Sequence, residues 1–456
     1  MRQSRREALK VMGAAAASCL APAVRPRCAH AESSKQPNVI VIMADDLGYG
    51  DLGCYGNREI RTPHLDGLAA RGMRWLDFHS NAPVCSPTRA ALMTGRYQQR
   101  CGIEGVVTAK GHRDTGMPLP ELTFGEVLRA TGYATALFGK WHLGYEAAFG
   151  PIHQGFDVFR GYVSGNVDYH SHVDQQGFED WWNGSRLSPE AGYTTDLISG
   201  HGVRFIEAHP DRPFCLYLAY EAPHYPYQGR KDKAIRASGR AAGSGVRGEA
   251  SAAVYREMVE AMDEGVGSIV AALRRAGIEE NTFLFFCSDN GAPAAGCNAP
   301  LRGAKGSLWE GGHRVPAIAC WPGRIPAGTV TQETAMTMDV FPTLAALAGA
   351  VLPARQTLDG VSLVPVLTEQ GRLRERSLFW RYNEARAVRR GEWKLLLRQG
   401  KRGGDSNAAS TRLYHLGNDV GETQNLAERE PETVAALQRE LAAWEQAVSA
   451  GVERRT

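Results

Sequence analysis

The fold of this chain is decided by a short run near its beginning, Asn38-Val39-Ile40-Val41-Ile42-Met43. The run is apolar almost throughout and rich in β-branched residues, which is typical of a strand that is buried on both faces. Similar short apolar runs recur along the chain, and segments with a helical pattern separate them. The runs are Ala134–Phe138, Phe214–Tyr220, Thr282–Cys287 and Pro316–Cys320, and the helical segments include Leu65–Arg71, Thr88–Met93 and Ala252–Ala276.

Strands that alternate with helices predict an α/β fold with a large, mostly parallel central sheet flanked by helices. The pattern changes after about residue 370, where short strand-like runs follow one another and an amphipathic helix comes last. We therefore expect a main domain over residues 36–370 and a small α+β subdomain with an antiparallel sheet over residues 371–456. The segments of this subdomain are Ser377–Arg381, Arg386–Arg389, Trp393–Leu397, a glycine- and serine-rich loop at Gly400–Ser410 and the helix Val434–Val448.

The composition is that of an ordinary globular protein. With 456 residues, of which 43% are hydrophobic and 22% charged, the chain is long enough to bury a large core. The formal net charge of +3 is too small to predict nucleic-acid binding, and no lysine and arginine cluster with interleaved aromatic residues is present. We therefore expect no nucleic-acid partner, and any attraction for an anionic substrate must come from the site itself.

The first 35 residues predict an export signal rather than a part of the fold. Ser4-Arg5-Arg6-Glu7-Ala8-Leu9-Lys10 resembles a twin-arginine signal, and an apolar stretch, Val11–Ala23, and a cleavage-like Ala29-His30-Ala31 follow it. The stretch is too short and too rich in alanine to span a membrane, so we expect no stable membrane insertion. We expect an exported, periplasmic or secreted protein. A lipid anchor on Cys19 is the alternative, although the Ala-Ala-Ser before it contains no leucine.

Among the nine cysteines, Cys85 has surroundings suited to chemistry. It opens the run Cys85-Ser86-Pro87-Thr88-Arg89-Ala90-Ala91-Leu92-Met93-Thr94-Gly95. Pro87 suits the first turn of a helix and Gly95 its end, so we place Cys85 at a helix N-terminus, where free N–H groups and the helix dipole favour an anion. Arg89 lies one turn further along the same face. A nucleophile, an anion-binding helix end and a fixed cation are the parts that sulfuryl or phosphoryl transfer needs.

Polar residues follow two of the predicted strands directly. Asp45 and Asp46 come after the first strand, and Ser288-Asp289-Asn290-Gly291 comes after Thr282–Cys287. The carboxyl ends of parallel strands are where α/β sheets build their sites. Two strands that deliver oxygen ligands to one edge indicate a hard divalent cation, Ca²⁺ or Mg²⁺. The candidate ligands are Asp45, Asp46, Asp289 and Asn290.

Two further segments carry basic residues that suit an anionic substrate. Lys140 and His142 lie two residues apart in Gly132-Tyr133-Ala134-Thr135-Ala136-Leu137-Phe138-Gly139-Lys140-Trp141-His142-Leu143-Gly144, so in an extended segment they share one face. A cation beside a titratable imidazole can stabilise an anionic oxygen and move a proton near neutral pH. His224 follows the run Phe214–Tyr220, and taken alone it is more often a structural residue.

These segments together resemble the type I, formylglycine-dependent sulfatases of the alkaline phosphatase-like superfamily. Cys85-x-Pro87-x-Arg89, followed by a helix of small residues and Thr-Gly, matches the first family signature, and Gly132–Gly144 matches the second. The resemblance covers roughly residues 37–445. It implies an alkaline phosphatase-like sandwich with a small C-terminal subdomain, and the hydrolysis of a sulfate ester as the reaction.

The resemblance also assigns roles. In this family a formylglycine-generating enzyme oxidises the cysteine to formylglycine (3-oxoalanine) before export, and the hydrated aldehyde attacks sulfur. His224 then protonates the departing alcohol, and His142 assists the release of sulfate by taking a proton. The implied Ca²⁺ ligands are Asp45, Asp46, Asp289, Asn290 and the oxidised Cys85, and the implied sulfate-binding cations are Arg89, Lys140 and Lys305, the last in Arg302-Gly303-Ala304-Lys305-Gly306.

An exported enzyme of this kind implies a sulfated carbohydrate as substrate, either a polysaccharide or a glycosaminoglycan-type oligosaccharide. Two alternatives are a phosphodiester or phosphonate monoester hydrolase of the same superfamily and an inactive carbohydrate-binding relative. The polar loop Gly161–His172 is a candidate substrate loop, and Trp181-Trp182 either stacks on a sugar or belongs to the core. A zinc site at His170 and His172 lacks an evident third ligand, and Glu310 and His313-Arg314 are expected to be loop structure.

Overall fold

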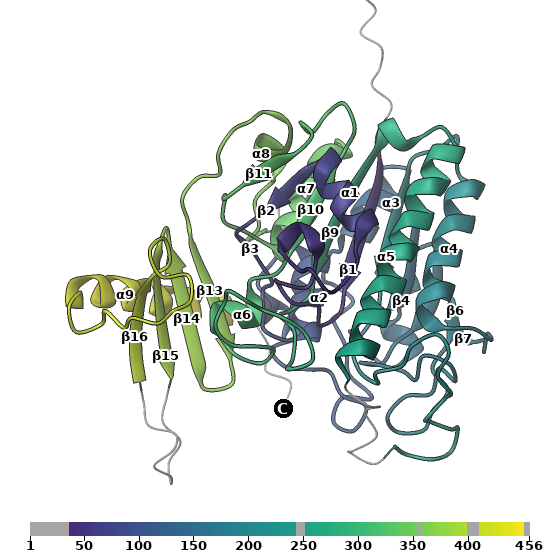
Figure 1. Ribbon diagram of the computed structural model, residues 1–456, viewed down its shortest axis with the longest axis horizontal. Helices are drawn as coiled ribbons and strands as arrows, with labels where there is room; N and C mark the ends of the chain where they lie inside the picture. Colours follow the sequence, from purple (N-terminus) through teal and green to yellow (C-terminus); the bar gives the residue numbers. More distant parts are fainter. Residues whose placement is uncertain (1–35, 243–250, 354–356, 399–409, 451–456) are drawn as a thin grey trace, which may run out of the picture. The chain divides into compact units, whose positions relative to one another are not determined.

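The computed structural model describes residues 36–242, 251–353, 357–398 and 410–450 (Figure 1). The predicted export signal and most of the Gly400–Ser410 loop lie outside the described residues. Among the described helices, none is both long enough and apolar enough to cross a membrane. The seven cysteines of the described part are all free thiols.

A ten-stranded sheet in the order β11-β2-β10-β9-β1-β8-β4-β5-β6-β7 forms the centre of the fold. Its five middle strands are parallel to one another, as the sequence predicts. They are β9 (Thr282–Ser288), β1 (Asn38–Ala44), β8 (Phe214–Ala219), β4 (Ala134–Lys140) and β5 (Val158–Tyr162). The flanking strands are β10 (Ala317–Cys320), which is antiparallel to β9, β2 (Met73–Trp75), β11 (Thr329–Thr331), β6 (Trp182–Asn183) and β7 (Arg186–Leu187).

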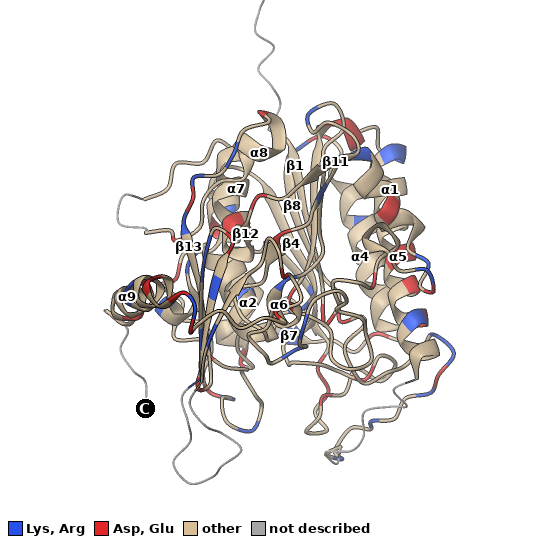
Figure 2. Ribbon diagram, turned by 60° about the vertical axis from the view of Figure 1, so that its left-hand side comes forward, with Lys and Arg blue, Asp and Glu red and all other residues tan. Residues whose placement is uncertain are grey.

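Helices cover both faces of this sheet (Figure 2). Alternate side chains of β1 therefore enter two different cores, which explains why its sequence is apolar without alternation. Val39, Val41 and Met43 pack in one core, and Ile40 and Ile42 pack in the other. The first core contains side chains of α2 (Cys85–Thr94), α3 (Phe124–Ala130) and α7 (Val340–Leu347), and the second those of α1 (Pro63–Arg71), α4 (Thr194–Ala208) and α5 (Ala252–Arg275).

The C-terminal part is a four-stranded antiparallel sheet against which α9 (Pro431–Ser449) packs. A third apolar core lies between this sheet, α9 and residues of the main part such as Tyr97 and Met338. The strands are β13 (Ser377–Tyr382), β14 (Ala385–Arg390), β15 (Trp393–Arg398) and β16 (Ser410–His415). The remaining elements are α6 (Glu310–His313), α8 (Val364–Thr368) and the parallel pair β3 (Phe78–His79) and β12 (Ala335–Met336).

The α/β class and the antiparallel C-terminal sheet are confirmed, and two local features differ from the expectation. We predicted three strands in the C-terminal sheet, and β16 is a fourth; its first residues, Ser410, Thr411 and Arg412, are polar and show no apolar run. Helix α2 begins at Cys85 itself rather than at Pro87. The division of the chain at residue 370 stays a prediction.

Candidate active site

The carboxyl ends of β1 and β9 bring polar side chains from distant parts of the chain together. Ala44 pairs with Ser288, so the two strands end level with each other and the residues that follow them meet. The Asp46 backbone N–H donates to Asp289 Oδ1 at 3.2 Å, and Asn290 Nδ2 donates to Asp46 Oδ1 at 2.7 Å. These side chains are buried. The structure therefore places four of the five predicted metal ligands, Asp45, Asp46, Asp289 and Asn290, at one edge of the sheet.

The donor set at this edge fits a hard divalent cation. Asp45 Oδ1, Asp46 Oδ2 and Asn290 Oδ1 are buried, and none of them has a hydrogen-bond partner among the described residues. A buried oxygen without a partner is costly, and carboxylate and amide oxygens are the ligands that Ca²⁺ and Mg²⁺ prefer. Asp45, Cys85 and Asp289 also place one ligand atom each within 4.8 Å of one another.

Cys85 is the first residue of α2 and is 2% exposed. Its position at the helix N-terminus directs free backbone N–H groups toward the site, as the sequence indicates. Burial raises the pKa of its thiol, although Lys140 and Lys305 act in the opposite direction. An unmodified Cys85 is therefore held as a neutral thiol, which is a poor nucleophile.

Three cations surround the carboxylates. Lys140 Nζ lies 2.5 Å from Asp45 Oδ2, and Arg89 Nη2 lies 2.8 Å from Asp289 Oδ2. The third, Lys305 Nζ, lies 2.5 Å from the Asp46 carboxylate. Their cost of burial is offset by these charge pairs. Burial and Arg89 act to lower the pKa of Lys140, but Asp45, with Cys85 and Asp289, raises it above its ordinary value, so Lys140 stays charged.

The two predicted histidines lie at the same site and are neutral at pH 7. Burial, with the charges of Lys140 and Arg89, lowers the pKa of His142 well below its ordinary value. Burial also lowers the pKa of His224 well below that value, although Asp46, whose Oδ2 lies 3.6 Å from His224 Nε2, opposes this effect.

The backbone is strained at two of these residues. Asp46 has φ 66° and His142 has φ 61°, in the left-handed region that residues other than glycine seldom adopt. The loop after β5 approaches His142 closely at Gly165, where an added Cβ would lie 2.7 Å from His142 Nε2. Glycine is required there because any side chain would displace the imidazole.

These groups open into one cavity of about 680 Å³. Cys85, His142, His224 and Lys305 line it, whereas Arg89 and Lys140 are buried behind it. The predicted substrate loop contributes Ser164 and Asn166 to the wall, which places that loop at the cavity as expected. Sequence reasoning missed Tyr382 and Gln175, which also line the cavity; no motif marks either residue, and Tyr382 comes from the C-terminal sheet.

The remaining candidates are structural. Trp181 is 1% exposed and stacks on His172, so it belongs to the core. His170 and His172 do not belong to any potential metal cluster of the described residues. Glu310 and His313 lie in the short helix α6 rather than in a loop, and their role is structural: Lys394 Nζ lies 2.9 Å from Glu310 Oε1, in a buried network that joins the C-terminal sheet to the main part.

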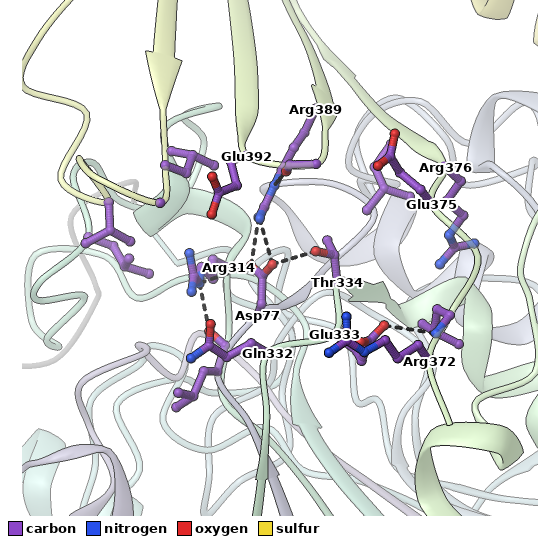
Figure 3. A pocket seen from close by; sticks show the side chains of 18 of the residues that line it. Asp77, Arg314, Gln332, Glu333, Thr334, Arg372, Glu375, Arg376, Arg389 and Glu392 are labelled. Carbon is purple, nitrogen blue, oxygen red and sulfur yellow. Dashed lines mark hydrogen bonds and ion pairs between the residues drawn. The ribbon is translucent and has the colours of Figure 1, made fainter. Parts of the chain in front are cut away.

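The junction between the C-terminal sheet and the main part encloses a space of about 680 Å³, and none of the predicted catalytic or metal-binding residues lines it (Figure 3). Its central contact is a two-pronged ion pair in which Arg389 donates to both oxygens of Asp77 at 2.7 Å. Arg314 and Arg376 on its wall are also paired with carboxylates. Since these arginines are already paired with carboxylates of the protein, we interpret the ion pairs around this space as contacts that hold the two parts together.

Comparison with known proteins identifies the family. A family model described as sulfatase matches residues 37–350, which is more than half of the chain. The chain belongs to the sulfatase family. A second family model, described as N-sulphoglucosamine sulphohydrolase, C-terminal, matches residues 304–447 of this sulfatase.

Curated relatives match this sulfatase over most of its length. Arylsulfatase A of Homo sapiens is 37% identical over 89% of this chain and 87% of its own. N-acetylgalactosamine-6-sulfatase of Sus scrofa is 35% identical over 88% of this chain and 84% of its own. The crystal structure of Ps i-CgsB in complex with k-i-k-neocarrahexaose superposes with a TM-score of 0.80 at 31% identity and covers 90% of this chain and 93% of that one. The protein is therefore a sulfuric ester hydrolase of the alkaline phosphatase-like superfamily.

Proposed function

We propose that this sulfatase removes sulfate from a sulfated carbohydrate and uses formylglycine formed from Cys85. The observation that carries the proposal is the single cavity at which Cys85, a carboxylate cluster suited to Ca²⁺, cationic side chains and two neutral histidines come together. Such a set offers a nucleophile position, charge stabilisation and proton transfer at the same place.

Relatives support a carbohydrate substrate. One solved relative, 31% identical, is recorded in complex with k-i-k-neocarrahexaose, and another, 25% identical, is the PsFucS1 sulfatase from Pseudoalteromonas sp.. The curated relatives include N-acetylgalactosamine-6-sulfatase. The cavity also carries polar side chains suited to hydroxyl groups, such as Ser164, Asn166 and Gln175.

The chain's own cations stabilise the charge that grows on the sulfuryl oxygens. Lys305 lines the cavity, and Arg89 and Lys140 act from behind it through short pairs with the carboxylates. When bound, Ca²⁺ on Asp45, Asp46, Asp289 and Asn290 would supply Lewis-acid stabilisation of a sulfate oxygen, and the hydrated formylglycine would supply the attacking oxygen. Fixed charges in a water-poor site are the largest single contribution to such catalysis.

His142 is arranged to take a proton. Its Nε2 lies 3.0 Å from the carbonyl oxygen of Val107, which only accepts, so the proton sits on Nε2 and the lone pair on Nδ1. Nδ1 is buried and has no partner among the described residues. A neutral imidazole with a free lone pair at the cavity is a general base available for the release of sulfate.

His224 is arranged to give a proton once substrate is bound. Its Nδ1 lies 2.5 Å from the Tyr225 carbonyl oxygen, so donation from Nε2 requires the doubly protonated ring. In the free enzyme burial keeps the ring neutral. A bound sulfate ester adds a negative charge beside the ring and raises its pKa, and protonated His224 then protonates the departing alcohol.

The proposal includes two conditions outside the site. A formylglycine-generating enzyme must act on Cys85 before the protein folds and is exported, because Cys85 is buried in the folded chain. We also propose that the protein is exported to the periplasm or secreted, on the twin-arginine-like segment Ser4–Lys10.

The test is the release of inorganic sulfate from a panel of sulfated oligosaccharides, with protein co-expressed with a formylglycine-generating enzyme. Release from one saccharide, and none from the Cys85→Ala protein, would support the proposal and identify the substrate. If peptide mass shows that Cys85 is converted, and phosphate esters are hydrolysed while no sulfate ester is, the proposal is wrong.

A further inference from the structure

A second hollow of about 600 Å³ adjoins the active-site cavity, and the two share wall residues. Gly306 and Tyr382 line both. Tyr382 is half-buried and packs against the third apolar core. One short segment contributes residues to both walls: Lys305 lines the active-site cavity, whereas Arg302 and Trp309 line the second hollow. A ligand held at the active site therefore reaches this hollow by passing Tyr382.

The second hollow carries an excess of positive charge. Arg302, Arg398 and Arg412 line it, and Glu384 is the one carboxylate among the described residues of its wall. The guanidinium carbon of Arg302 lies 3.8 Å from the centre of the Trp309 indole ring, and that of Arg412 lies 5.3 Å from the same centre.

Two guanidinium groups beside one aromatic ring repel each other unless an anion lies between or above them. Within the described residues, neither Arg302 nor Arg412 forms an ion pair with a carboxylate at 4.0 Å or less; Arg302 Nη1 instead donates to the backbone carbonyl of Glu422 at 2.7 Å. The nearby Asp419 carboxylate accepts hydrogen bonds from the backbone of Thr423 and Gln424. Burial acts to raise the pKa of Asp419, but these hydrogen bonds, with the charge of Arg302, lower it below its ordinary value. The Trp309 ring fixes both arginines in place, because a guanidinium over an aromatic face is attracted to it.

We propose that this hollow binds a second anionic group of the saccharide chain whose sulfate ester is cleaved. This inference rests on the proposed function and narrows its substrate class to oligosaccharides and polysaccharides with sulfate or carboxylate groups on more than one sugar. A planar guanidinium pairs with a sulfate or carboxylate through two parallel hydrogen bonds. The aromatic side chain of Tyr382 offers a surface for the sugar between the two anionic groups.

Binding, rather than turnover, tests the inference, so that its failure is distinguished from failure of the proposed function. The probe is a dextran sulfate oligosaccharide, and the protein is the full-length Cys85→Ala variant, studied by isothermal titration calorimetry. Arg412→Gln should weaken binding roughly tenfold, since a charge-assisted contact is lost. The matched control is Arg390→Gln, an arginine of the same sheet that is paired with Glu375 and Glu440 outside this hollow and should leave the affinity within twofold.

Inorganic sulfate separates the two sites. One sulfate ion cannot span both sites, whereas an oligosaccharide can, so Arg412→Gln should weaken the binding of dextran sulfate much more than it weakens the binding of inorganic sulfate at the active site. The affinity for dextran sulfate should also depend less on salt concentration in the Arg412→Gln protein than in the protein that keeps Arg412. The inference is overturned if Arg412→Gln and Arg302→Gln both leave the dextran sulfate affinity within twofold of the Arg390→Gln control. It is also overturned if Arg412→Gln weakens the binding of inorganic sulfate and of dextran sulfate by the same factor.

Discussion

Replacing Lys305 by methionine tests the electrostatic part of the proposed mechanism. Lys305 Nζ lies 2.5 Å from the Asp46 carboxylate, lines the cavity and has a side chain that is 20% exposed. Methionine keeps most of the length of the side chain and removes its charge. The substitution therefore leaves the shape of the cavity nearly unchanged while it removes one cation beside the sulfuryl group.

The size of the loss follows from the position of this charge. A unit charge about 4 Å from an anionic oxygen contributes about 4 kcal/mol at an effective dielectric constant of about 20. Partial exposure of Lys305 reduces this figure through screening. Removal of a single preorganised donor typically lowers kcat by about 10²–10³, and we expect the lower end, about a hundredfold.

The assay is hydrolysis of a small aryl sulfate, such as 4-nitrophenyl sulfate, with the conversion of Cys85 measured by peptide mass in every preparation. Lys231→Met is the matched control, because Lys231 is an exposed lysine outside the cavity and should keep kcat within twofold. The reasoning is refuted if Lys305→Met keeps more than a tenth of the wild-type kcat at equal conversion.

Three further predictions concern the buried charge network and the metal. Lys394→Met should lower the free energy of unfolding in urea by about 3–5 kcal/mol, because Glu310 and Glu422 each lie 2.9 Å from its Nζ and lose their cation; a loss below about 1 kcal/mol would contradict this. Burial and Lys394 lower the pKa of His313 well below 6.5. The unfolded chain therefore binds a proton that the native chain does not, and stability should fall as the pH drops below about 6.5, by up to about 1.4 kcal/mol per pH unit. Urea midpoints at pH 7.5 and 5.5 should differ less in His313→Gln than in wild type, whereas the exposed His153→Gln should behave as wild type. Removal of divalent cations by a chelator should abolish aryl sulfate hydrolysis, and added Ca²⁺ should restore it and raise the free energy of unfolding by ~2.7 kcal/mol at a hundred times its Kd; full activity after chelation would exclude the metal.

The layered fold could be predicted because each buried strand has a local sequence pattern that marks it. The run Asn38–Met43 is apolar at every position after the first and rich in β-branched residues, which is typical of a strand covered on both faces. The convergence of Asp46 and Asn290 was predicted for a related reason. Both follow parallel strands of the same sheet, and the register of β1 with β9 brings the strand ends level.

Other features depend on contacts that no local pattern records. Tyr382 reaches the cavity from the C-terminal sheet, and its own neighbourhood has only the alternation of an ordinary strand. The arginines of the second hollow, Arg302 and Arg412, are brought to one indole ring by the tertiary structure alone. The first residues of β16 are polar because that strand lies in a small sheet with partly exposed residues, so no apolar run marks its start.

The role of Cys85 is the central claim, and the fraction of Cys85 converted to formylglycine is the quantity that tests it most directly. Preparations with graded conversion, obtained by varying the amount of co-expressed formylglycine-generating enzyme, are measured by peptide mass and by initial rate on an aryl sulfate. We predict that the rate rises in proportion to the converted fraction and extrapolates to zero for unmodified protein. A rate that is independent of conversion, or substantial turnover by fully unmodified Cys85, would contradict the account.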